Sequence, residues 1–115
     1  MYGFKENCRL LIKQDYDHVF KQAKKIATSD FMILYRENTI GHARLGLAIS
    51  KKVINKAHDR NRFKRLLRET FRQRIHLPAV DIIVLARSGV NKTDHSILAA
   101  NLGNAWDKLV ILCGA

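Results

Sequence analysis

The sequence predicts an α+β sandwich in which two or three helices cover one sheet. Apolar residues recur in several separate segments, and their spacing alternates between that of helices and that of strands. The 115 residues, 47% of them hydrophobic, suffice for one core. A single proline and six scattered glycines leave no linker that would divide the chain. We therefore expect residues 1–115 to form a single domain.

The first half of the chain predicts one helix followed by strands. Residues 15–25 carry apolar side chains on one helical face. Residues 30–37 and 43–50 are rich in strand-forming residues and flank a turn at residues 38–41. This spacing predicts an antiparallel hairpin with a loop of four or five residues. The short segment 25–28 is a candidate edge strand.

The second half predicts helix, strand and helix. Residues 58–75 place apolar side chains on one helical side. That side holds Phe63, Leu66, Leu67, Thr70, Phe71 and Ile75. Residues 80–86 are apolar and β-branched enough for a buried strand. Residues 94–112 predict a closing helix, whose core spacing is shared by Leu98, Leu102, Ala105, Trp106 and Leu109.

The densest charge of the chain lies in residues 51–74, where ten Lys and Arg stand against only Asp59 and Glu69. In a helix over residues 58–75, the side opposite the apolar one collects Asn61, Arg62, Lys64, Arg65, Arg68, Glu69 and Arg72. Like charges one helical turn apart repel each other unless an anion binds. A charge run is often only a solvated helix face, but the scarcity of acids here favours an anionic partner.

The whole chain is also strongly basic. Its net charge of +11 and pI near 10.1 attract polyanions before any specific contact forms. Nucleic acid is therefore the expected partner. An anionic membrane is the main alternative partner. Binding to a membrane surface is typical of a basic helix that has a wide, aromatic-rich apolar face and does not belong to a globular fold. No segment approaches the roughly 18 continuous apolar residues of a membrane span, and the first residues lack a secretory signal. We expect a soluble, cytoplasmic protein.

Catalytic and metal-binding patterns are not found in the sequence. The five histidines lack metal-ligand spacing, and Cys8 and Cys113 stand near opposite ends of the chain, as expected of reduced thiols. Asp15 and Asp17 lie at a predicted helix start, where capping explains them. A metal-dependent nuclease would need a carboxylate cluster among Asp15, Asp17, Asp59 and Asp81. The residues alone predict binding, with no catalytic residue and no metal site in the protein.

The basic segment resembles the signature of a known family. Residues 56–69, KAHDRNRFKRLLRE, follow residues 44–52, RLGLAISKK, and the pairs KR and RE stand at fixed offsets from RNR. This pattern is similar to that of the protein subunit of bacterial ribonuclease P, and the likeness covers nearly the whole chain. The resemblance implies the order α-β-β-β-α-β-α around a mixed sheet of about four strands. It also implies a left-handed crossover at the basic helix, against the usual right-handed rule.

The resemblance implies a division of labour between RNA and protein. In the family, a large RNA subunit carries the active site and its Mg²⁺, and the small protein helps to bind precursor tRNA while the 5′ leader is removed by hydrolysis. The implied partners are the ribonuclease P RNA subunit and precursor tRNA, without DNA or membrane. The alternative from the residues is a general structured-RNA-binding or ribosome-associated protein with no role in cleavage.

The first implied surface is the basic helix, which in the family lies against the RNA subunit. The matching residues are Arg60, Asn61, Arg62, Lys64, Arg65 and Arg68. Two of them have a structural alternative, because Asn61 is also suited to cap or brace the helix start and Arg60 to pair with Asp59.

The second implied surface is a cleft between the first helix and the sheet, which in the family cradles the single-stranded leader. Tyr16, Phe20 and Tyr35 match its aromatic positions, although an offset of one residue along the strand would exchange Tyr35 for Leu34. The cations expected at the rim are Lys51, Lys52, Lys56 and Arg87. Many family members carry Phe at the position of Tyr16, so this chain adds a hydroxyl. The alternative is that Tyr16 and Phe20, one turn apart, are ordinary core residues.

Overall fold

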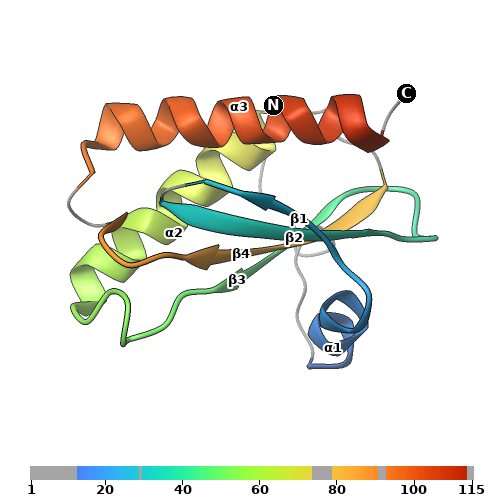
Figure 1. The fold of residues 1–115 in the computed structure, drawn as a ribbon, viewed down its shortest axis with the longest axis horizontal. Coiled ribbons are helices and arrows are strands. Elements are labelled where there is room, and N and C mark those ends of the chain that lie inside the picture. The colour runs from blue at the N-terminus through green and yellow to red at the C-terminus, as the bar shows by residue number, and fades with distance from the viewer. Residues whose placement is uncertain (1–12, 29, 74–78, 91–92, 114–115) are drawn as a thin grey trace.

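The computed structural model describes residues 13–28, 30–73, 79–90 and 93–113. Its elements, in chain order, are α1 (Lys13–Lys21), β1 (Lys24–Ala27), β2 (Phe31–Glu37), β3 (Arg44–Ala48), α2 (Ala57–Arg72), β4 (Val80–Ala86) and α3 (His95–Cys113) (Figure 1). This order confirms the predicted α-β-β-β-α-β-α arrangement. None of the helices in these ranges has the length and apolarity needed to cross a bilayer.

The four strands form one mixed sheet in the order β1-β2-β4-β3. The pairs β1–β2 and β2–β4 are antiparallel, whereas β3 and β4 are parallel, and the chain passes through α2 between them. The predicted hairpin of residues 30–37 and 43–50 is therefore wrong, because β4 lies between its two strands. β4 is buried from Val80 to Val84, and such an apolar strand is most stable with neighbours on both sides.

The largest differences from the predicted boundaries are at the ends of two helices. α1 ends at Lys21 and not at residue 25, because Lys24 and Lys25 pair with β2 as part of β1. The candidate edge strand is thereby confirmed. α2 ends at Arg72, and Ile75, predicted to lie on its apolar side, is outside the described residues.

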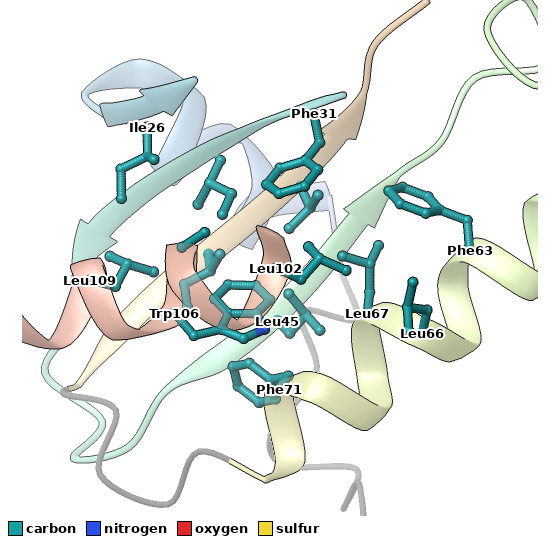
Figure 2. Close-up of a cluster of buried hydrophobic side chains, with 14 of the residues drawn as sticks. Ile26, Phe31, Leu45, Phe63, Leu66, Leu67, Phe71, Leu102, Trp106 and Leu109 are labelled. Carbon is teal, nitrogen blue, oxygen red and sulfur yellow. The ribbon is translucent and has the colours of Figure 1, made fainter. Parts of the chain in front are cut away.

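The helices form two unequal layers around the sheet. Figure 1 shows α2 and α3 on one side and α1 on the other. The main core fills the space between the sheet and the α2–α3 layer, where Phe31, Leu67 and Trp106 are fully buried (Figure 2). All five core positions predicted for residues 94–112 are buried.

Trp106 joins the two helices of this layer. Its Nε1 donates to Thr70 Oγ1 at 2.9 Å, which satisfies the indole donor inside the core. Its ring meets that of Phe71 edge to face, with centroids 5.8 Å apart. Thr70 in turn donates to the carbonyl of Leu66, one turn earlier.

Candidate nucleic-acid interface

The α2 helix is apolar on its inner side and basic on its outer side. Phe63, Leu66, Leu67 and Phe71 are buried, as their helical spacing predicts. On the outer side, Asn61, Arg62 and Arg65 are exposed, and Lys64 and Arg68 are half-buried. Within the described ranges, the ion pairs are those of Arg44 with Asp15 and Asp81, and no described acid lies within 4 Å of these α2 cations.

Arg60 stands apart from the other cations of α2. Its Nη1 donates to the carbonyl oxygens of Ile54 and Asn55 at 2.9 and 3.0 Å. Arg60 therefore braces the segment that leads into α2 rather than pairing with Asp59. Asn61 does not cap the helix either, because α2 begins after Lys56, whose backbone takes the cap position without a side-chain hydrogen bond.

The other candidate surface lies on the α1 side of the sheet. Its small buried cluster is Val19, Leu34 and Ile83, and the partly buried apolar side chains packed against it are Tyr16, Ala23, Met32, Ala48 and Leu85. Ala48 and Leu85 form the last pair between β3 and β4. Since these strands are parallel, the segments that follow them leave the sheet at the same end of the strands.

Tyr16 and Phe20 lie on α1 beside this cluster with very different exposure. Phe20 is 49% exposed, which contradicts its alternative as a core residue. Tyr16 is half-buried, and its hydroxyl oxygen accepts a hydrogen bond from the backbone N–H of Leu47 at 3.2 Å. The fully buried residue between them is Val19.

Tyr35 does not lie with these two aromatic residues. It is 5% exposed and belongs to the main core on the α2–α3 side. Leu34, its neighbour on β2, faces α1. The placement of Tyr35 in the cleft is therefore wrong by one residue, because side chains alternate between the two faces of a strand. Burial, with a smaller contribution from Cys113, raises the pKa of Tyr35.

The four rim cations are all exposed. Lys51 and Lys52 follow β3, Arg87 follows β4, and Lys56 precedes α2. Arg87 is anchored, because its Nη1 donates to the carbonyl of Thr28 at 2.9 Å. Its guanidinium has further N–H donors for a ligand.

A polar network that the motifs did not reveal joins α1 to the sheet. Arg44 Nε and Nη2 donate to the two carboxylate oxygens of Asp81, both at 2.8 Å, and Asp81 is only 2% exposed. Asn38 Nδ2 donates to the same carboxylate at 2.8 Å. The hydrogen bond to Asp81 raises the pKa of Arg44. The available sequence signal was a single acid, Asp81, inside the apolar run 80–86.

The carboxylates considered for a nuclease do not form a metal centre in the described residues. No group of three or more His, Cys, Asp and Glu side chains is arranged there to hold a metal ion. Asp15 and Asp81 both face Arg44 instead.

Comparisons with known proteins give one consistent result. A family model described as Ribonuclease P matches residues 4–110. The ribonuclease P protein component of Legionella pneumophila (strain Corby) is 57% identical over 114 residues, which cover 99% of each chain. That of Chromohalobacter salexigens is 48% identical, over 93% of this chain and 85% of the relative.

Solved structures agree with these sequence matches. The RNase P protein from Staphylococcus aureus at 2.0 Å superposes with a TM-score of 0.75 and 29% identity, over 91% of this chain and 94% of that one. The RNase P protein from Thermotoga maritima gives a TM-score of 0.77 and 29% identity, over 87% and 96%.

Proposed function

The chain belongs to the ribonuclease P protein family, and from this premise we propose that it acts in the ribonucleoprotein through two separate RNA-binding surfaces on one domain. Catalysis and its Mg²⁺ belong to the RNA subunit. The protein binds that subunit and the 5′ leader of precursor tRNA, and so assists the endonucleolytic cut that produces the mature 5′ end. We place this activity in the cytoplasm.

The outer side of α2 is the proposed surface for the RNA subunit. Arg62 and Arg65 are exposed, and Arg68 is half-buried beside them. Guanidinium groups bind phosphate oxygens through two parallel hydrogen bonds. A helix with several such groups can follow an RNA backbone without reading bases in the deep A-form groove. The observation that carries the assignment is this row of cations without acidic partners in the described part of the chain.

The α1 side of the sheet is the proposed leader cleft. Tyr16 packs against the same buried cluster as Met32, Ala48 and Leu85. Phe20, one helical turn later on α1, leaves about half of its surface exposed. Unpaired bases stack on aromatic rings with about 1 to 3 kcal/mol per base, largely irrespective of sequence. That tolerance suits a protein that handles many different leaders. The exposed cations at the rim, Lys51, Lys52, Lys56 and Arg87, are suited to hold the leader phosphates.

Cleavage of a 5′-extended precursor tRNA at low Mg²⁺ tests the proposal. The protein alone, a bacterial ribonuclease P RNA alone and their mixture are compared. We expect efficient cleavage at the mature 5′ end only in the mixture. No enhancement over the RNA alone would favour a general RNA-binding role, and cleavage by the protein alone would require an active site within it.

Matched variants separate the two surfaces. Arg62→Ala and Arg65→Ala should weaken assembly with the RNA subunit, whereas Arg72→Ala, an equal charge loss in the last turn of α2, should have less effect. Phe20→Ala should weaken binding of leader-bearing precursor without affecting mature tRNA. Ile111→Ala, which truncates an exposed apolar side chain on α3, is its control. Equal losses for Phe20→Ala and its control would contradict the cleft assignment.

A further inference from the structure

The α1 helix forms one wall of the proposed cleft with little apolar burial of its own. Of its nine residues, only Val19 is fully buried. Three polar contacts connect the helix to the sheet. Tyr16 accepts from the backbone N–H of Leu47, and the carbonyl of His18 accepts from Arg36 Nη1 at 2.8 Å. The third contact is the ion pair of Asp15 with Arg44, at 3.6 Å.

Among the sheet residues that contact α1, Arg44 has the side chain that is held most firmly in place. Its guanidinium is locked by the two short hydrogen bonds to buried Asp81, and Asn38 binds that carboxylate from the loop after β2. The Nη2 group that binds Asp81 also approaches Asp15 in the first turn of α1. The side chains of Arg44 and Asp15 are 15% and 24% exposed, so solvent screens this pair only in part.

Asp15 is adjacent in sequence to Tyr16, and Phe20 follows one helical turn later. A shift of the first turn of α1 therefore moves both aromatic rings relative to Met32, Ala48 and Leu85. Binding sites lose affinity when the groups that hold their side chains allow displacements of about 1 Å. The contact of Arg44 with Asp15 is placed to prevent such a shift.

We propose that Arg44 is a positioning residue for leader binding, which holds Asp15 and thereby sets the distance of Tyr16 and Phe20 from the sheet. Arg44 does not contact the leader itself, and Asp81 serves to orient its guanidinium. This inference rests on the proposed function, because it assigns a role in the same cleft.

The test compares two neighbouring carboxylates of α1 in the reconstituted holoenzyme. Asp15→Asn and Asp17→Asn each remove one negative charge, but only Asp15 meets Arg44, whereas Asp17 is exposed. If the acids of α1 merely repel RNA, both variants bind precursor more tightly. If Asp15 positions the helix, Asp15→Asn weakens leader-dependent binding about two- to fivefold, the range of a partly exposed ion pair. Asp17→Asn then leaves it unchanged or strengthens it.

The quantity to measure is the ratio of the affinities for leader-bearing precursor and mature tRNA, with the thermal unfolding midpoint recorded alongside. A general loss of folded protein lowers both affinities together, so only a change in the ratio supports positioning. Equal ratios for Asp15→Asn and Asp17→Asn would overturn the proposal. A wild-type holoenzyme without preference for the leader would contradict the proposed function itself, before any variant is compared.

A second variant keeps the proposal testable if Asp15→Asn lowers the amount of folded protein. Arg44→Lys retains the charge, but its ammonium group lacks the guanidinium fork that reaches Asp81 and Asp15 together. We expect Arg44→Lys to lower the affinity ratio as Asp15→Asn does, and the double variant to lower it no further. Independent, additive losses would show that the two residues act separately and would also overturn the proposal.

Discussion

The two faces of the sheet differ in how they hold their helices. On the α2–α3 face, a continuous apolar cluster includes Phe31, Leu67 and Trp106, all fully buried (Figure 2). On the α1 face, the buried cluster that the described residues form consists of Val19, Leu34 and Ile83. Hydrogen bonds and one ion pair hold α1 there in addition to this small cluster.

Because of this difference, one face of the sheet serves mainly the stability of the fold and the other face mainly ligand binding. Apolar burial contributes about 25 cal/mol per Å² and depends little on the relative orientation of the side chains. The α2–α3 face, hereafter the thick face, therefore supplies most of the folding free energy, and the α1 face is the thin face. Polar contacts contribute less but fix direction. A thinly covered face also leaves an aromatic side chain such as Phe20 half exposed. Ligand-binding elements are commonly drawn from such less stable regions.

The largest expected effect is on the thick face. Phe31→Ala removes a fully buried ring from the main core, and we expect it to lower the free energy of unfolding by about 3 to 5 kcal/mol. Denaturant unfolding measures the loss. The matched change on the other face, Phe20→Ala, should alter stability by less than about 0.5 kcal/mol. Similar losses for the two substitutions would show that the faces do not differ in this way.

The next effect concerns the polar network. Asp81→Asn removes the carboxylate that binds Arg44 and leaves the guanidinium partly buried with a neutral partner. Breaking one side of a buried pair typically costs about 3 to 5 kcal/mol. We expect about 2 to 4 kcal/mol here, since the 15% exposure of Arg44 gives it some access to water. The exposed Asp17→Asn is the control, and an equal effect would contradict the structural role of Asp81.

The order of elements was predictable because it depends on local pattern. The apolar periodicity of residues 58–75 and 94–112 identified both helices of the thick layer, and their buried residues agree with it. Strand pairing depends on contacts distant in sequence, so the short connection after residues 30–37 suggested a hairpin. The insertion of β4 between β2 and β3 follows from its burial on both faces, which a short apolar run alone does not specify.

The candidate site was predictable in part. The cations of α2 and the pair Tyr16 and Phe20 came from spacing and family resemblance, and both groups are at least partly accessible in the structure. Tyr35 was misplaced because a shift of one residue along a strand reverses the face. The contact of Arg44 with Asp81 joins positions 37 residues apart. Neither periodicity nor a local motif carries information about such a pair.

On the thin face, truncation of a buried side chain should lower both the stability of the protein and its binding of the leader. Val19→Ala removes two methyl groups from the one fully buried side chain of α1, and we expect a loss of about 1.5 to 2.5 kcal/mol in unfolding free energy. It should also weaken binding of leader-bearing precursor, since α1 carries Tyr16 and Phe20. Phe31→Ala should not change the leader preference of the protein that remains folded. Unchanged leader preference in Val19→Ala would separate α1 packing from binding.

The smallest expected effect is at Cys113, where the last turn of α3 packs against the edge of the main core. Burial, then the nearby Glu37, raises the pKa of the Cys113 thiol, although Lys24 opposes the shift. Because the folded state disfavours the thiolate, the stability that Cys113 contributes is complete below the pKa of the unfolded chain. It declines as the pH rises through the higher pKa of the folded state. Alkylation by iodoacetamide requires the thiolate, so in a Cys8→Ser background the folded protein should react at a higher pH than the same chain in denaturant. Reaction of both forms at the same pH would mean that the folded α2–α3 layer leaves this thiol as accessible to water as the denatured chain does.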